Sequence, residues 1–423
     1  MNPLVSIAFR NLLRARRRNL LSGGTMALGT AALVLGGGLS DGIARQLTAS
    51  LIAVQTGHLQ VVVRQADFEP QNSPFDAYGQ ALIPDSAALA ARIVAGAGGA
   101  GVRRAVPFLH GRGTAIAGNR SSLATVVGIL PQEEVELRAA HPADAGAFLP
   151  LDDPLATYVA APIARKLRLG IGDTVSFVIQ TPQGAVNSVD AVVCGIFRKG
   201  APWYDTTFYL PLATAQALFD HPGAATNIKM TLADGSSAAA RDARPVVAAI
   251  VGQPPGLEPD ERARVETFEE AGRFSFSIIQ ANQTALAVLS GFLFLAAAVG
   301  IVNSMLMSVH ERTREIGTVR ALGMRRAMVV RLFILEGLAL GMVAAATGIA
   351  VGAAGVLYYG ARGIPMDTMT LAWVAGGDHL FPVLTVTNVA RAALAIAGLS
   401  TAAAVYPAIT ASRLEPREAL HHI

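Results

Sequence analysis

The stretch SVHERTREIGTVRALGMRRAMVVRL, residues 308–332, carries six arginines and two glutamates between two long runs with almost no charge. The preceding run, 274–309, has no Asp, Glu, Lys or Arg in 36 residues, and the following run, 337–361, is also uncharged. A helix needs about 20 mostly apolar residues to cross a bilayer. The stretch is therefore expected to be a short charged helix between two membrane spans.

The composition agrees with a membrane protein. Of 423 residues, 52% are hydrophobic and 15% are charged, whereas soluble domains carry roughly 25% charged residues. Mean hydropathy is +0.44. Two more uncharged windows, 19–40 and 392–412, are long enough to span. More than 230 residues of mixed sequence separate the first and second windows, so four spans and one large domain are expected.

Arginines near the span ends predict the orientation. Five lie in residues 10–18, six in 312–331 and two in 413–417, all on one side of a four-span protein. The positive-inside rule makes that side cytoplasmic, which predicts a multi-pass membrane protein with both termini inside. RARRRNLLSGG (14–24) also resembles a secretory signal, but a 22-residue apolar run without an A-x-A site favours a retained span.

The large domain is then outside the cytoplasm. Its slight excess of acidic over basic residues argues against a nucleic-acid partner. Apolar, β-branched runs predict strands, and 3.6-residue patterns predict helices. TPQG (181–184) is expected to be a hairpin turn. The expected strands are 58–63, 123–130, 173–180 and 189–197, and the expected helices are 86–97, 161–169, 212–219 and 236–252. The predicted fold is an α-helical membrane protein with four transmembrane helices and a large α+β periplasmic domain between helices 1 and 2.

Motifs for catalysis fail in their context. GLSDG (38–42) closes a membrane span instead of joining a strand to a helix, and GAGGAG (96–101) follows a helical pattern where a dinucleotide fingerprint needs a strand. None of the three lysines stands in a P-loop. No histidine pair has zinc-ligand spacing. The chain is therefore expected to be non-catalytic, without a metal or cofactor of its own, and Cys194, the single cysteine, is expected to be a buried small residue.

Few ionisable residues lie within the spans. Glu336, about one turn into the third span, is expected to pair with Arg331 or Arg320. GLALG (337–341) and GIAVG (348–352) place two small-xxx-small steps in one helix, which permits close helix packing. In the charged helix, one face is expected to consist of Val309, Ile316, Val319 and Gly323, with Arg312 and Glu315 forming an (i, i+3) pair.

The segment HERTREIGTVRALGMRRAMVVRLFILEGLALGMVAAATGIAVG (310–352) strongly resembles the membrane core of the four-span permeases of macrolide exporters, lipoprotein-releasing complexes and the cell-division permease, the type VII or mechanotransmitting ABC transporters. YPAITASRLEPREAL (406–420) and NPLVSIAFRNLLRARRRNLL (2–21) resemble the two ends of those permeases. APIARKLRLGIGDTVSFV (161–178) and VVCGIFRKGAPWYDTTFYLPLATAQALF (192–219) resemble their periplasmic domain.

The resemblance implies a location in the bacterial inner membrane and a function for the charged helix. It would be the coupling helix that docks onto a separate ABC ATPase dimer, which binds ATP and Mg. Movement would pass through the second span and a stalk to the periplasmic domain. The residues that match the coupling segment are Glu311, Arg314, Glu315, Arg320, Leu322 and Gly323.

TGHLQVVV (56–63) and VVGILPQEE (126–134) resemble the lipoprotein-releasing branch. This implies extraction of lipoproteins from the inner membrane, with acyl chains entering between the first and second spans, a second permease copy or paralogue, and a periplasmic lipoprotein carrier. Residues placed by position as substrate-binding are Leu33, Leu39, Phe276, Ile279 and Leu286. A macrolide- or peptide-type efflux permease, a permease that controls a cell-wall hydrolase, and a membrane-anchored sensor without an ATPase remain alternatives.

The expected organisation runs in chain order. The segments are a cytoplasmic amphipathic helix (1–18), the first span (19–40), the periplasmic domain in two lobes (41–273), the stalk and second span (274–308), the coupling helix (309–330), the third span (331–359), a periplasmic loop (360–387), the fourth span (388–411) and a cytoplasmic tail (412–423).

Overall fold

The computed structural model describes residues 16–67, 78–79, 81–180, 185–198, 202–366, 375 and 377–414. Residues 1–15 of the expected amphipathic helix, the expected turn at 181–184 and residues 415–423 of the tail lie outside these ranges. Contacts divide the chain into a helical unit (1–43, 280–364 and 381–423) and a mixed unit (44–279 and 365–380). Each unit is described by itself.

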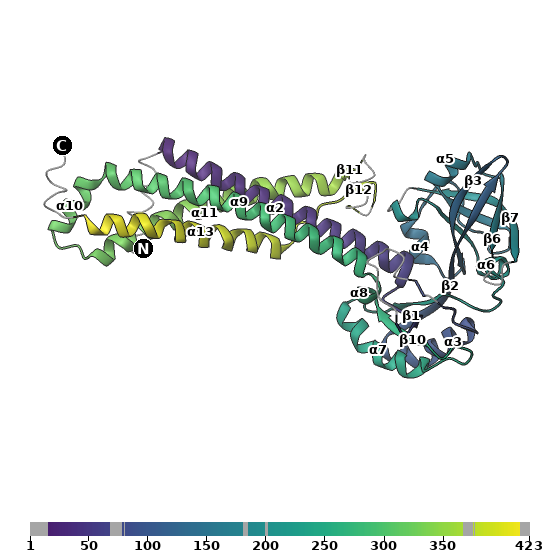
Figure 1. The fold of residues 1–423 in the computed structure, drawn as a ribbon. Helices are drawn as coiled ribbons and strands as arrows, with labels where there is room; N and C mark the ends of the chain where they lie inside the picture. Colours follow the sequence, from purple (N-terminus) through teal and green to yellow (C-terminus); the bar gives the residue numbers. More distant parts are fainter. Residues whose placement is uncertain are drawn as a thin grey trace. The chain divides into compact units, whose positions relative to one another are not determined.

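Long apolar helices make up the helical unit, and they run alongside one another in Figure 1. Four helices in the described part of the chain are long and apolar enough to cross a membrane. Their cores contain the expected spans, but the helices extend further. The helices are α2 (Arg16–Ser50), α9 (Arg273–Glu311), α11 (Arg326–Arg362) and α13 (Val386–Arg413), with the short α10 (Thr313–Ala321) between α9 and α11.

Glycines on α11 allow two neighbouring helices to approach closely. A Cβ atom added at Gly337 or Gly341 would come within 3.0 Å of α13 atoms, and one added at Gly348 or Gly352 would come within 3.0 Å of α2 atoms. The two small-xxx-small steps therefore serve different partners. Van der Waals packing of this kind is a main source of helix association where lipid removes the hydrophobic driving force.

The mixed unit contains ten hydrogen-bonded strands in its main sheet. The strands are β1 (Leu59–Gln65), β2 (Val102–Ala117), β3 (Arg120–Ile129), β4 (Ala143–Gly146), β5 (Ala156–Ala160), β6 (Thr174–Gln180), β7 (Val186–Phe197), β8 (Thr207–Pro211), β9 (Asn227–Leu232) and β10 (Glu261–Thr267). The helices are α3 (Ser86–Ala97), α4 (Val135–Ala140), α5 (Ala161–Leu167), α6 (Leu212–Phe219), α7 (Ser237–Val251) and α8 (Phe268–Ala271). A two-stranded pair, β11 (Ile364–Pro365) and β12 (His379–Leu380), stands apart from the main sheet.

The long strand β2 takes part in two cores. Its first half pairs with β9, and the order β10-β1-β9-β2 forms an antiparallel layer. Helices α3 and α7 pack on this layer (Figure 1) and bury Leu89, Ile93 and Val247 against Val61, Val63 and other strand residues. Alternation of apolar residues along β1 thus fills one core with period 2.

The second half of β2 belongs to a closed barrel. Pairings run β2–β3, β3–β8, β8–β5, β5–β7, β7–β6 and β6–β2, so the chain of partners returns to its first strand. Tyr158, Phe177, Phe197 and Phe208 are fully buried in its core. Closure removes exposed strand edges, which would otherwise pair with other chains.

Cys194 lies on β7 beside this core. Its thiol donates a hydrogen bond to the carbonyl oxygen of Thr157 at 3.2 Å, and burial raises the pKa of the thiol to about 11. A protonated thiol is a poor nucleophile, so the side chain has the character of a small packing residue.

Candidate functional site

The charged helix is defined by a break at its start. Helix α9 ends at Glu311, and Arg312 leaves helical geometry with φ −111° and ψ 15°. The backbone N–H of Arg312 still donates to the carbonyl oxygens of Ser308 and Val309, at 3.2 and 3.3 Å. The buried hydroxyl of Thr313 donates to Val309 at 3.0 Å. These bonds hold α10 directly against the end of α9.

A C-terminal cap ends α10 after nine residues. The backbone N–H of Gly323 donates to the carbonyl oxygen of Arg320 at 3.0 Å, and the backbone N–H of Met324 donates to the carbonyl oxygen of Val319 at 3.2 Å. This is the Schellman pattern, with Gly323 at the position that needs positive φ, and its φ is +100°. The expectation of one helix over 309–330 is therefore wrong: α9, α10 and α11 share this range, with breaks at Arg312 and at 322–325.

One side of α10 faces the helical core. Ile316 packs on the cluster that contains the buried Val309, and Gly317 is buried. Val319 is 39% exposed, and no atom lies within 4 Å of a Cβ added at Gly323. Of the expected apolar face, only Val309 and Ile316 are thus part of the core, since Val319 is exposed within α10 and Gly323 follows its end.

The opposite side is open. Five of the six residues in the expected coupling set are exposed, namely Glu311, Arg314, Glu315, Leu322 and Gly323. Leu322 is 83% exposed at the helix end. The structure brings these five residues together on one end of the helical unit.

Arg320 is placed differently from the other five. Its guanidinium Nη1 donates to the carbonyl oxygen of Leu414, just after α13, and the side chain is half-buried. Leu414 also packs on the helical core. Arg320 thus joins α10 to the end of α13 within the chain.

Glu336 contacts a residue that the sequence argument did not name. Its Oε1 lies 3.6 Å from Nη1 of Arg312, whereas Arg331 and Arg320 were the expected partners. Arg312 stands at the break between α9 and α10, and Glu336 is on α11. The sequence predicts that Arg312 lies within the charged helix, whereas the structure places it at the break before α10, which periodicity does not reveal.

A cavity of about 440 Å³ lies among α2, α9 and α13. Of the residues expected to bind substrate, Leu33 and Leu286 line it, and Leu39, Phe276 and Ile279 do not belong to its described lining. Phe276 instead packs against the core of the mixed unit, with its ring 6.1 Å from that of Phe268. The expected substrate set is thus divided between the two units.

Polar residues of the same cavity were missed by sequence reasoning. They are Ser40, Asp41, Gln283, Asn388 and Arg391. Four of them stand at or beside the end of an apolar window, where a polar residue is ordinarily assigned to the membrane interface, and Gln283 is an uncharged residue within the second window. Only the packing of three helices shows that they meet.

Family models match most of the chain. A model of the MacB-like periplasmic core domain matches residues 20–244, more than half of the chain. A model of the FtsX-like permease C-terminal region matches residues 287–416. The chain belongs to the MacB-like and FtsX-like family of ABC transporter permeases.

Curated relatives of this permease include exporters and lipoprotein-releasing proteins. It is 30% identical over 180 residues to the macrolide export ATP-binding/permease protein MacB of Rhodopirellula baltica, covering 43% of this chain and 24% of that protein. It is 24% identical over 344 residues to the lipoprotein-releasing system transmembrane protein LolC of Neisseria meningitidis serogroup B. This match covers 76% of this chain and 79% of the LolC protein. The chain thus spans about a quarter of the MacB relative's length.

The permease is also similar to a solved structure, the periplasmic region of MacB from Actinobacillus actinomycetemcomitans. The match covers 52% of this chain and 94% of that chain, with 13% identity and a TM-score of 0.37.

Proposed function

We propose that the permease couples an ABC ATPase dimer to movement of its periplasmic domain, and that α10 is the contact with the ATPase. The observation that carries this proposal is the exposed end formed by Glu311, Arg314, Glu315, Leu322 and Gly323. An apolar side chain surrounded by both signs of charge suits a protein partner, since interface cores are apolar and their rims are polar. The chain itself supplies no cofactor, and ATP and Mg are bound by the partner.

The capped geometry of α10 supports transmission of force. A helix held by Thr313 at its start and by the Schellman motif at its end resists bending under load. Ile316 and Arg320 attach it to the helical core and to the end of α13. A push on Leu322 would therefore move the helices together.

The proposed orientation follows the arginines. Both termini and α10 are cytoplasmic, the mixed unit is periplasmic, and the protein lies in the inner membrane. Helix α9 has 39 residues, about 58 Å at 1.5 Å per residue, against a hydrocarbon thickness of about 30 Å. The surplus suits the proposed stalk, which would carry movement beyond the bilayer.

We propose that the cargo is a lipoprotein and that the permease takes part in its release from the membrane. The supporting observation is the similarity to a LolC protein over 76% of this chain. Acyl chains would enter between α2 and α9, near Leu33 and Leu286, and the lipoprotein would pass to a periplasmic carrier. A second permease copy or paralogue would complete the complex.

An efflux permease is the second candidate, because a MacB protein is also among the relatives. The two candidates differ in what binds the permease. Purification of the tagged chain at native expression, followed by mass spectrometry of everything bound, tests both. An ABC ATPase with triacylated lipoproteins supports lipoprotein release. The ATPase with an outer-membrane duct supports efflux, and the absence of any ATPase would overturn the coupling proposal in favour of a membrane-anchored sensor.

A further inference from the structure

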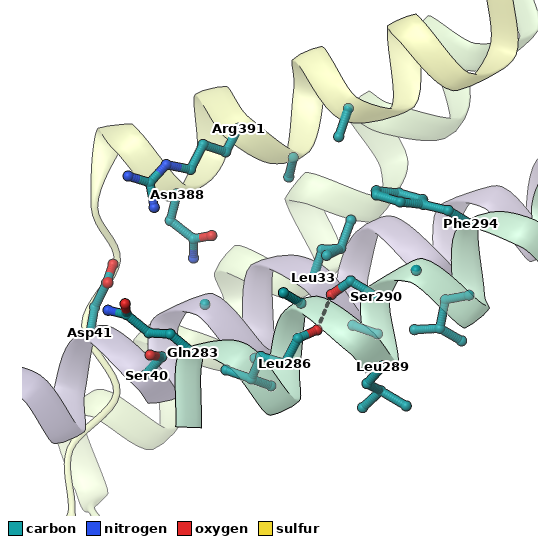
Figure 2. Close-up of a pocket in the computed structure, with 18 residues that line it drawn as sticks. Leu33, Ser40, Asp41, Gln283, Leu286, Leu289, Ser290, Phe294, Asn388 and Arg391 are labelled. Carbon is teal, nitrogen blue, oxygen red and sulfur yellow. Dashed lines mark hydrogen bonds between the residues drawn. The ribbon is translucent and has the colours of Figure 1, made fainter. Parts of the chain in front are cut away.

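The cavity among α2, α9 and α13 has two chemically different ends. Figure 2 shows Ser40, Asp41, Gln283, Asn388 and Arg391 gathered at one end, with Leu33 and Phe294 further along. Its volume, about 440 Å³, falls in the range of about 300–1,000 Å³ typical of ligand sites. Such a shape suits an elongated amphiphile.

The polar end contains a buried group without a partner. Ser40 is 5% exposed, lines the cavity, and its hydroxyl makes no hydrogen bond with any residue that the structure describes. Leaving a buried hydroxyl unsatisfied costs about 1–3 kcal/mol, and membrane spans offer little water to satisfy it. A ligand atom in the cavity would remove this penalty.

Two opposite charges face the same end of the cavity without pairing. Arg391 is exposed, and the structure shows no ion pair between its guanidinium and the Asp41 carboxylate. Asp41 accepts a hydrogen bond from the Thr385 hydroxyl at 2.7 Å. The cavity mouth therefore offers one cation and one anion at different positions, which matches a zwitterion better than a single charge.

Helix α2 is shaped to leave this space. Asn388 donates from Nδ2 to the carbonyl oxygen of Val34 at 2.9 Å, and a Cβ added at Gly37 would overlap the Asn388 amide. Gly36 and Gly37 both line the cavity. Gly37 lets α13 approach α2, and Gly36, where an added Cβ would lie 3.1 Å from Leu286, lets α9 approach it, while the groove beside them remains open.

We propose that this cavity binds a phospholipid whose headgroup is zwitterionic and carries a primary ammonium, as phosphatidylethanolamine does. The phosphate contacts Arg391, Ser40 and Gln283, the ammonium contacts Asp41, and an acyl chain lies along Leu33, Leu286 and Phe294. The surroundings of these spans are lipid, so a lipid is the ligand at hand.

The headgroup separates this occupant from the proposed cargo. The triacylated cysteine of a lipoprotein carries neither a phosphate nor a free ammonium, so Arg391 and Asp41 would have no partner on it. The lipid site shares Leu33 and Leu286 with the proposed entry of the cargo, but its headgroup contacts go beyond the proposed function and do not depend on it. Loss of ATPase coupling in α10 variants would leave the lipid site intact, and loss of lipid would leave ATPase binding intact.

The test is lipid competition with the full chain. The purified protein is offered equal amounts of dioleoyl phosphatidylethanolamine, phosphatidylglycerol and phosphatidylcholine in detergent, and retained lipid is counted by native mass spectrometry. We expect the wild type to retain phosphatidylethanolamine about tenfold better than phosphatidylcholine, the size expected for one charge-assisted hydrogen bond. Quaternary choline lacks the N–H donors that Asp41 requires.

Charge variants resolve the two contacts. Arg391→Gln should lower retention of all three phospholipids about tenfold, and Asp41→Asn should abolish only the preference for ethanolamine over choline. Arg413→Gln, which removes an exposed arginine at the other end of α13, is the matched control and should change nothing. Ser40→Ala removes a single hydroxyl and should lower retention of all three, which provides a test even if a charge variant does not fold.

Three results would overturn the proposal. One is that the wild type retains the three lipids in the same ratio in which they were offered. Another is equal retention by Arg391→Gln and Arg413→Gln. The third is a lipid-free dimer that crosslinks through position 287 in the cavity wall, which would assign the cavity to a second copy of the chain.

Discussion

Nη1 of Arg312 lies 3.6 Å from Oε1 of Glu336, with the two side chains 13% and 9% exposed. Arg312 marks the break between α9 and α10, and Glu336 belongs to α11. The pair therefore joins the start of the proposed coupling helix to the next long helix. A mostly buried pair of this kind is sensitive to loss of one member, because the other charge remains buried.

We predict that Arg312→Gln and Glu336→Gln each lower stability by about 2–3 kcal/mol. The double variant should be less destabilised than the sum of the singles, since the pair is lost only once. Thermal unfolding of the four proteins in nanodiscs measures this coupling. Strict additivity would mean that the two side chains do not interact.

A second buried pair is expected to behave in the same way in the mixed unit. Nζ of Lys229 lies 2.5 Å from Oε2 of Glu134, with side chains 6% and 1% exposed, and it also donates to the carbonyl oxygen of Ala53 at 3.2 Å. Glu134→Gln should cost about 3–5 kcal/mol, and the apolar pair Lys229→Met with Glu134→Leu should restore most of that loss. Hydrogen exchange of β9 and α4 is the readout. A double variant as unstable as Glu134→Gln alone would show that the charge pair itself is needed.

Stability of the mixed unit should fall at acid pH. Burial lowers the pKa of His110 and of His141 to about 3. The ring of His110 stacks on that of Tyr78 with the ring centroids 3.7 Å apart, and Nδ1 of His141 lies 3.1 Å from the Tyr209 hydroxyl oxygen. Since the folded pKa lies below the unfolded value near 6.5, the folded state is favoured above pH 6.5. Stability is lost as pH falls from 6.5 towards 3, because the unfolded chain then binds the extra protons.

The expected slope is about 1.4 kcal/mol per pH unit for each histidine below pH 6.5. Hydrogen exchange at pH 6.0 and 4.5, corrected for intrinsic rates, measures it in the full chain. His141→Gln should remove one histidine's share of the slope even if it lowers stability at every pH. An unchanged slope in that variant would show that His141 takes up its proton in the folded state.

Proline at Ala285 tests the proposed stalk. It lies inside α9, where proline removes a backbone hydrogen bond and disrupts the helix at a cost of about 3 kcal/mol or more. We expect ATP hydrolysis by the complex to continue while cargo release stops. Ala285→Ser, which keeps the helix, is the control. Normal release by the proline variant would show that a continuous helix is not needed.

Much of the architecture could be predicted because each element has a strong local pattern. The four long helices contain the uncharged windows, and α3, α5, α6 and α7 coincide with the predicted helices within a few residues. The predicted strands correspond to β1, β3, β6 and β7. The period of apolar residues and the length of apolar runs are properties of contiguous sequence, so they can be recognised without knowledge of the fold.

The closed barrel could not be predicted, because it depends on pairing between distant strands. Short strands such as β5 and β8, of five residues each, have too little pattern to stand out from loops. Pairing of β6 with β2 closes the ring through only three residue pairs, Thr114–Val178 to Ile116–Ser176. Nothing local in those residues indicates that contact.

The candidate site divides in the same way. The exposed charges of α10 were predicted, since they lie within one short segment, but the helix ends were not, because the breaks at Arg312 and Gly323 depend on capping bonds. The cavity residues Asp41, Gln283 and Arg391 come from three helices far apart in sequence. Their meeting follows from the helix packing that Gly36 and Gly37 allow, since Gly36 faces Leu286 of α9 and Gly37 faces Asn388 of α13.

The most direct test of the account is the ATP hydrolysis rate of the purified complex when Glu315 is replaced by arginine. Glu315 is exposed on α10, so the substitution should leave the permease folded while reversing one charge at the proposed ATPase contact. Glu258→Arg, at an exposed glutamate of the mixed unit, is the matched control. The account predicts loss of permease-dependent ATPase stimulation for Glu315→Arg and normal stimulation for Glu258→Arg. Equal, wild-type stimulation in both variants would contradict it.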